Sequence, residues 1–150
     1  MTLLPVTVLY KERVLPSGLF YLATLTLPIS LILVALPFSD TVGFVMAGIS
    51  IPLVFALTWI AAPLITLTET ELRVGNVVIE RALLGRVEVV SGKDAFNERG
   101  IKLDSRAYTR FQVGVKELVK IEIRDELDPT PYWLIATRNP EVITGLINKR

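Results

Sequence analysis

The sequence predicts a membrane protein in which a two-helix transmembrane hairpin is followed by a small α+β domain. Residues 17–62 are almost wholly apolar and contain one charged residue, Asp40. Residues 63–150 alternate short β-branched segments with turns and end on an amphipathic helix, which predicts a mostly antiparallel sheet. These observations divide the chain into a lead-in at 1–16, a hairpin at 17–62 and a domain at 63–150.

The apolar stretch is interrupted at residues 37–41, where Pro-Phe-Ser-Asp-Thr brings together a proline, hydroxyl residues and the charge. The interruption predicts two spans, 17–38 and 42–62, joined by a turn in which Ser39 or Asp40 caps the second helix. At about 1.5 Å rise per residue, each span covers roughly the 30 Å of a bilayer's hydrocarbon core. A soluble chain of 150 residues has too little other surface to cover two such helices, so we expect both to cross the membrane.

Basic residues predict the orientation of the hairpin. Lys11 and Arg13 precede the first span, Arg73 follows the second, and the turn between them carries only Asp40. Because cytoplasmic flanks are enriched in Lys and Arg, we expect both termini in the cytoplasm and the two-span protein in the plasma membrane.

Each span contains a proline, Pro28 or Pro52, which is expected to kink its helix. Helix breaks line substrate sites in transporters, so a small transporter component is one alternative. No acidic or basic residue lies within either span, and this favours structural kinks. Gly43, Ala47 and Ser50 form a small-residue face on the second helix, suited to packing on the first helix, to self-association or to a protein partner.

Composition excludes several classes of function. The chain has 16 basic and 15 acidic residues, and this balance gives no indication of nucleic-acid binding. It has no cysteine and no histidine, which removes disulfides, Cys/His zinc sites and the usual general base near neutral pH. No glycine-rich phosphate-binding motif is present. We therefore expect no cofactor, no metal and no catalytic residue.

Local signals outline the domain. Gly75-Asn76 predicts a tight turn between two strands, since both residues accept a positive φ. Gly100 is placed to end a helix over residues 92–99. Residues 6–10 also alternate like a short strand, but we interpret them as part of the lead-in. The strands expected in the domain are residues 64–68, 71–74, 77–80, 86–90, 108–115, 119–124 and 132–137.

The C-terminal segment carries the clearest local pattern. Asp128 and Pro129 open a turn, and Asn139 and Pro140 suit the N-cap and first position of a helix. One apolar stripe on this helix is expected to lie across the sheet. The stripe consists of Val142, Ile143, Leu146 and Ile147.

Residues 128–140, Asp-Pro-Thr-Pro-Tyr-Trp-Leu-Ile-Ala-Thr-Arg-Asn-Pro, behind the hairpin and the Arg106-Ala107-Tyr108 segment, resemble an actinobacterial family of small membrane proteins catalogued as domain of unknown function 3093. The resemblance covers nearly the whole chain and implies a two-helix topology with a cytoplasmic domain. It brings no activity and no catalytic residue. The domain is also similar in outline to bacterial pleckstrin-homology-like (PH-like) domains that follow two membrane helices.

Two groups of side chains are candidates for contact with lipid or protein. Basic residues outnumber acidic ones between positions 99 and 124, which suits anionic headgroups, although a solvated mixed-charge face is the alternative that we slightly favour. Tyr132 and Trp133 point to opposite faces of their strand, so one enters the core and the other is available outside. The residues assigned to contact are Arg106, Arg110, Lys116, Tyr132, Trp133 and Arg138.

The sequence thus favours a membrane-anchored binding or scaffold module whose domain is held close to the bilayer. An enzyme, or an accessory subunit of one, that uses Asp128, Tyr132 and Arg138 is a second alternative beside the transporter component. A hollow joining Asp128, Arg138 and Arg106 would favour the enzyme. The expected partners are the lipid bilayer and a protein.

Overall fold

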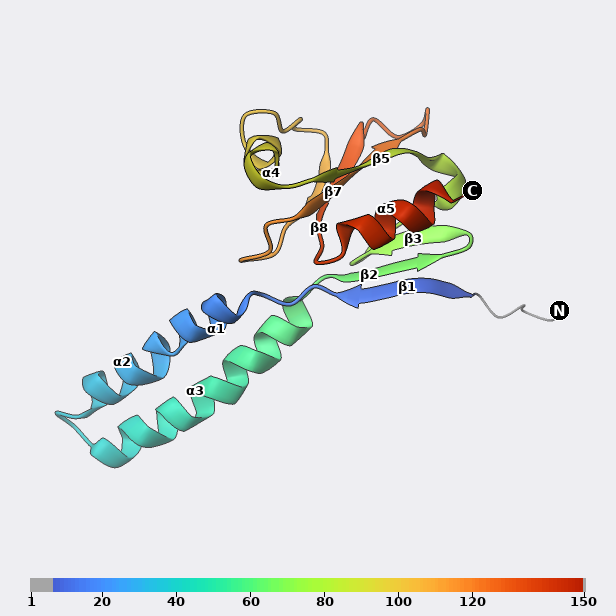
Figure 1. Cartoon of the computed structure of the whole chain (residues 1–150). Helices are drawn as coiled ribbons and strands as arrows, with labels where there is room; N and C mark the ends of the chain where they lie inside the picture. The colour runs from blue at the N-terminus through green and yellow to red at the C-terminus, as the bar shows by residue number, and fades with distance from the viewer. Residues whose placement is uncertain (1–6, 150) are drawn as a thin grey trace. The chain divides into compact units, whose positions relative to one another are not determined.

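The structure, a computed structural model, describes residues 7–149 and divides the chain into two compact units. One unit is the segment Leu15–Ala62, which forms an apolar helical hairpin. The other unit, called the domain below, contains the described residues on either side of that segment. Figure 1 shows helices along the hairpin and mostly strands in the domain.

The hairpin contains the helices α1 (Gly18–Thr24), α2 (Thr26–Ala35) and α3 (Asp40–Ala61). The stretch from α1 to the end of α2, and α3 by itself, are each long and apolar enough to cross a membrane. Ser39 caps α3 by accepting a hydrogen bond from the Val42 N–H at 3.4 Å, as predicted. Both predicted spans are therefore helical, although the first ends at Ala35, three residues before the predicted end.

The two prolines act differently. Pro28 has no N–H to offer the Thr24 carbonyl, and the first span is divided at Leu25 into α1 and α2. Pro52 lies inside α3, which continues through it as one helix. The kink predicted at Pro28 thus corresponds to a break between helices, whereas α3 is unbroken at Pro52.

The small-residue face of α3 is buried within the hairpin. Gly43, Ala47 and Ser50 are the buried residues of this helix. A Cβ atom added at Gly43 would lie 3.0 Å from the Ala35 Cβ and 3.2 Å from the Ile32 Cα, so α2 and α3 approach closely here. The chain's own α2 covers this face, so the predicted packing on the first helix is confirmed. Self-association or a partner through the same face stays a prediction.

Sheet A has the strand order β1-β2-β3-β4. Its strands are β1 (Val8–Arg13), β2 (Leu64–Thr68), β3 (Glu71–Val74) and β4 (Val77–Glu80). β1 and β2 are antiparallel neighbours, with Arg13 opposite Leu64, so the hairpin takes the place of the loop between two adjacent strands. Gly75 has a φ of +62° and closes the β3–β4 turn with Asn76, as predicted.

The structure adds the segment before the hairpin to the domain. Residues 1–16 were expected to be a lead-in, but β1 belongs to sheet A and Val14 is fully buried in the core. The Val14 N–H donates to the Pro63 carbonyl oxygen at 2.9 Å, which joins the two chain segments at the base of the hairpin. Val6, part of the alternating segment, lies outside the described residues.

Sheet B has the order β5-β7-β8-β6. Its strands are β5 (Leu84–Val90), β6 (Tyr108–Arg110), β7 (Leu118–Ile123) and β8 (Tyr132–Ala136). β6 runs parallel to β8, and the other pairs are antiparallel. The strand predicted at 108–115 is wrong beyond Arg110, because Gly114, with a φ of +74°, turns the chain toward β7.

Three helical elements complete the domain: η1 (Arg81–Leu83), α4 (Gly92–Arg99) and α5 (Pro140–Asn148). α4 ends at Gly100, as predicted. α5 contacts β5 and β7 (Figure 1), and its Ile143 and Ile147 are buried, whereas Val142 of the predicted stripe is exposed. Buried side chains from both sheets and from α5 form one hydrophobic core.

Candidate functional site

The residues predicted to make contacts do not meet in one place. Trp133 and Asp128 line a hollow beside β4, Tyr132 lines a second hollow, and Lys116 and Arg138 line a third. The hollows lined by Asp128 and Arg138 share no residue, and Arg106 lines neither. None of these three hollows, all within residues 7–149, joins Asp128, Arg138 and Arg106, the arrangement that would have favoured an enzyme.

The hollow beside β4, called the β4 hollow, encloses about 280 Å³. Its apolar part includes Trp133, which is 3% exposed, and Leu83. Its carboxylates are Glu80, Asp125 and Asp128. The remaining lining residues are Val77, Val78, Ile79, Tyr108 and Thr130. An apolar hollow with carboxylates suits an aliphatic side chain that ends in a positive charge.

Pairing between strands positions the aromatic residues of this hollow. Tyr108 of β6 lies opposite Trp133 of β8, and their ring centroids are 4.8 Å apart. The Tyr108 hydroxyl donates to the Val74 carbonyl oxygen at 3.1 Å and so links β6 to sheet A. Trp133 is thus the core residue of the Tyr132-Trp133 pair. Tyr132 is partly exposed, and its hydroxyl accepts from the Asp104 N–H at 2.9 Å.

Local turns hold two of the carboxylates. Asp128 accepts from the Thr130 N–H at 2.9 Å, and Asp125 accepts from the Leu127 N–H at 2.9 Å. The hydrogen bonds from Thr130 lower the pKa of Asp128, because they stabilise the carboxylate. The Asp128 carboxylate thus accepts a hydrogen bond across Pro129, within the segment where the sequence predicted a turn. Both groups accept hydrogen bonds from their own turns, as Asp side chains commonly do.

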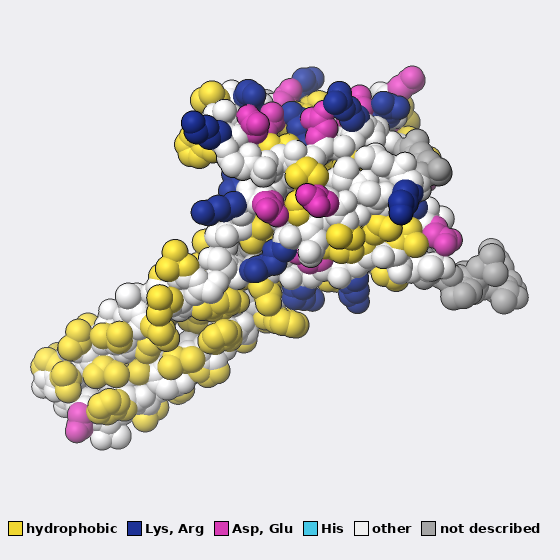
Figure 2. Space-filling view, viewed as in Figure 1, with side chains coloured by type: hydrophobic (Ala, Val, Ile, Leu, Met, Phe, Trp, Pro, Cys, Tyr) yellow, Lys and Arg dark blue, Asp and Glu magenta, His cyan; other side chains and the backbone are white. Residues whose placement is uncertain are grey.

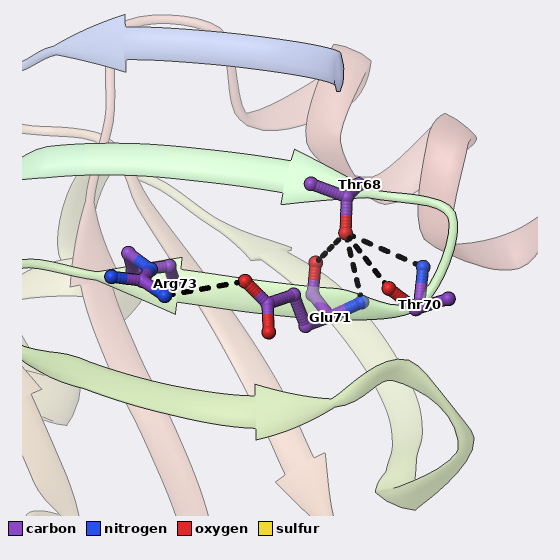
Figure 3. A network of polar contacts seen from close by, with 4 residues as sticks. All are labelled: Thr68, Thr70, Glu71 and Arg73. Carbon is purple, nitrogen blue, oxygen red and sulfur yellow. Dashed lines mark hydrogen bonds and ion pairs between the residues drawn. The ribbon is translucent and has the colours of Figure 1, made fainter. Parts of the chain in front are cut away.

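β4 is an edge strand of sheet A. On one face, Glu80 lies directly opposite Glu71 of β3, a like-charge pair that is unfavourable without a counter-charge. The Arg73 guanidinium, 3.4 Å from the Glu71 carboxylate, supplies this counter-charge to Glu71. In the neighbouring turn, the Thr68 hydroxyl forms hydrogen bonds with Thr70 and Glu71 (Figure 3). Within residues 7–149 no ion pair is recorded for Glu80, so its negative charge is available beside the β4 hollow.

A polar cluster that the sequence did not reveal joins β1 to the start of α5. The Glu12 carboxylate accepts from the Tyr10 hydroxyl at 2.7 Å, from the Thr137 hydroxyl at 2.5 Å and from the Arg138 N–H at 3.0 Å. Burial and the hydrogen bond to Glu12 raise the pKa of Tyr10. Nothing local marks these residues, because they meet only after β1 has paired with β2.

Asn139 belongs to the same cluster, which corrects its predicted role. It occupies the N-cap position of α5, before Pro140, but its side chain makes no capping hydrogen bond. The Asn139 Nδ2 instead donates to the Tyr10 hydroxyl at 3.3 Å. The position was predicted correctly and the side-chain partner was not.

Four of the basic residues between 99 and 124 have partners inside the domain. Arg106 binds Asp104 through two nitrogens, at 2.9 and 3.2 Å, and this bond lowers the pKa of Asp104 to about 2. The other partnered residues are Arg99 with the Val115 carbonyl, Lys120 with Glu98 and Arg124 with Glu122. The predicted contact surface therefore does not include the whole basic run. Among the described residues no ion pair is recorded for Arg110 or Lys116, both of which are exposed.

Metal binding has no support in the part of the chain that the structure describes. No group of three or more Asp or Glu residues there is arranged to hold a metal ion.

The fold and the site define a class of protein in which an apolar helical hairpin of two spans is inserted between adjacent strands of a mostly antiparallel β domain that ends on a helix. The chain belongs to the family described as "Protein of unknown function (DUF3093)", which matches residues 9–147, nearly the whole chain. No curated protein and no solved structure matches it.

Proposed function

We propose that this protein is a membrane-anchored binding module whose domain presents the β4 hollow to a protein partner. The observation that carries the proposal is the insertion of the hairpin between β1 and β2. Two short tethers, rather than one flexible linker, then join the domain to the hairpin. A domain attached in this way stays close to the bilayer, where it meets partners in or on the same membrane.

The surface of the hairpin supports a location in the membrane. Large apolar side chains such as Leu33, Phe44 and Ile60 are more than half exposed, and Figure 2 shows hydrophobic side chains over the hairpin and charged ones over the domain. Such a surface is unfavourable in water and favourable in hydrocarbon. With Lys11 and Arg13 before the hairpin and Asp40 at its turn, the proposed topology has two spans in the plasma membrane and both termini in the cytoplasm.

Binding rather than catalysis is supported by how the polar residues are used. Asp128 serves its own turn, Arg106 is paired with Asp104, and Arg138 lies at a different hollow from Asp128. We propose that the two-sheet domain closed by α5 is PH-like in outline. PH-like domains serve many binding functions, and this likeness is an analogy of fold.

The partner that fits the β4 hollow is an extended protein segment with a Lys or Arg side chain. An edge strand offers backbone hydrogen bonds to an added strand. The hollow beside it offers Trp133 and Leu83 to the aliphatic part of a long side chain, and Glu80 and Asp128 to its charge. Backbone pairing would supply affinity, and the hollow would select the basic residue.

Site-specific photocrosslinking tests this proposal with a matched control. Val78 on β4 and Val89 on β5 are valines on the edge strands of the two sheets, 42% and 41% exposed. A photoreactive amino acid at Val78 should crosslink, in intact membranes, to an extended segment that contains Lys or Arg. The same group at Val89 should not capture that segment, and Glu80→Gln should weaken the crosslink at Val78.

Two results would contradict the proposal. Equal crosslinking from Val78 and Val89 would mean that β4 is not a specific site. Release of the full-length chain from membranes by alkaline carbonate would mean that the hairpin does not anchor it.

A further inference from the structure

The loop between β6 and β7, residues 111–117 and called the β6–β7 loop, is held against Val14, the last residue of the domain before the hairpin. The Gln112 Nε2 donates to the Val14 carbonyl oxygen at 2.7 Å. The Arg99 guanidinium donates to the Val115 carbonyl oxygen at 2.5 Å and lies 5.4 Å from the centre of the Phe111 ring. These contacts within the domain give the loop a defined place next to Val14.

The chain itself limits how far this loop can lie from the hairpin. Val14 is followed by Leu15 and Pro16 before Ser17, which caps α1. Three residue steps span at most about 11 Å. If the hairpin crosses a bilayer, as proposed above, Ser17 lies at its surface. The part of the loop bound to Val14 is then close to the lipid headgroups at any tilt of the domain.

The exposed side chains of this loop match an anionic lipid surface. Val113 is 57% exposed and Phe111 is 37% exposed. Exposed cations flank them, Arg110 at the end of β6 and Lys116 within the loop, and Glu117 is the acidic residue of the loop. Apolar side chains between cations are the pattern of segments that insert at the boundary between headgroups and acyl chains.

We propose that the β6–β7 loop inserts Val113 and Phe111 into the headgroup region of the bilayer, with Arg110 and Lys116 on anionic lipid headgroups. This inference rests on the proposed membrane anchor and adds a second attachment of the domain. Insertion of the loop would orient the domain, because a third point of attachment to the membrane, in addition to the two tethers, restricts rotation of the domain about those tethers. The β4 hollow then has a defined direction relative to the membrane.

Fluorescence quenching in nanodiscs tests the inference, and the absence of cysteine makes single labels simple. The full chain would carry an environment-sensitive fluorophore on Val113→Cys, in discs of phosphatidylcholine alone or with phosphatidylglycerol. Nitroxide-labelled lipid should quench this label, and more strongly in the anionic discs. Arg110→Gln and Lys116→Gln should each lower the ratio of inserted to water-exposed loop by about fivefold in the anionic discs.

Two further labels serve as controls. Leu127 is 94% exposed and lies in the segment before β8, whereas the β6–β7 loop follows the C-terminal end of the parallel strand β6. Leu127→Cys should remain unquenched. Ile49 is an exposed residue in the middle of α3, and Ile49→Cys should be quenched in both kinds of disc.

The outcomes separate this inference from the proposed function. Quenching at Ile49 without quenching at Val113 would overturn the loop inference and leave the membrane anchor standing. Absence of quenching at both positions would overturn the anchor itself. A Val113 label that is shielded from water but not quenched by nitroxide lipid would show a protein on the loop, and equal quenching in neutral and anionic discs would remove the role of Arg110 and Lys116. Either result overturns the inference as stated.

Discussion

The Thr137 hydroxyl donates a hydrogen bond of 2.5 Å to the Glu12 carboxylate across 125 positions of sequence. Thr137 is fully buried directly after β8, and Glu12 lies in β1, just before the hairpin. The Thr137 oxygen also accepts from the Asn139 N–H at 3.2 Å. This contact joins the strand that enters the hairpin to the strand that leads into α5, so changes at either residue should affect the whole domain.

Thr137→Val should destabilise the domain by about 2 kcal/mol, because a buried hydroxyl that serves two partners is replaced by a methyl group. Thr137→Ser keeps the hydroxyl and should cost less. The measurement is denaturant unfolding of the full chain in micelles, followed by Trp133 fluorescence with Trp59→Phe as background. A loss in Thr137→Ser as large as the loss in Thr137→Val would mean that the hydroxyl of Thr137 contributes no more to stability than its methyl group.

Asn139→Asp should destabilise the domain at least as much as Asn139→Ala, by about 1 kcal/mol. An ordinary N-cap would tolerate Asp. Here the Asn139 amide donates to the Tyr10 hydroxyl, which itself donates to Glu12. An aspartate at position 139 would place a second carboxylate, which has no N–H donor, against the Tyr10 hydroxyl. The same unfolding assay shows which of the two variants is less stable. A stable Asn139→Asp variant beside a weakened Asn139→Ala variant would restore the capping role.

Stability should fall above pH 10 in a manner that depends on Tyr10. Burial, followed by the hydrogen bond to Glu12, raises the pKa of Tyr10 above the ordinary value of 10.0. The unfolded chain loses this proton near pH 10, whereas the folded domain retains it to higher pH. The contribution of Tyr10 to the free energy of unfolding is therefore complete below pH 10 and is lost as the pH rises through the raised pKa. The free energies of unfolding of Tyr10→Phe and of the unaltered chain should converge as the pH rises above 10. A difference between them that stays constant with pH would contradict the assignment.

Gly43→Ala should weaken the hairpin by about 1–3 kcal/mol, because the added Cβ meets the Ile32 backbone and the Ala35 Cβ. Gly48→Ala is the matched control on the same helix. A Cβ at Gly48 meets nothing within 4 Å, so the variant should be neutral or gain up to about 1 kcal/mol of helix propensity. Thermal loss of helical circular dichroism in micelles compares them. A similar loss in both would mean that close packing on α2 is not what selects glycine at position 43.

Several features follow from local sequence alone. The apolar length of residues 17–62, broken at Ser39, determines two helices, because hydrocarbon-length apolar runs leave few other structures. Gly75 marks the β3–β4 turn through its positive φ, and Gly100 marks the end of α4. Each of these depends on residues within a few positions of one another or on composition, so no knowledge of the rest of the fold is needed.

Other features were decided only by the tertiary structure. β1 becomes a strand because β2, on the far side of the hairpin, supplies its hydrogen-bond partners, and six residues cannot form a sheet by themselves. The contact between Glu12 and Thr137, the use of the Asn139 amide on Tyr10 and the burial of Trp133 rather than Tyr132 follow from that pairing and from the packing of the two sheets. The β4 hollow likewise arises where β4 of one sheet meets β6 and β8 of the other. Contacts between segments far apart in sequence leave no periodicity or local motif, because the energy that selects them is gained only once both segments are in place.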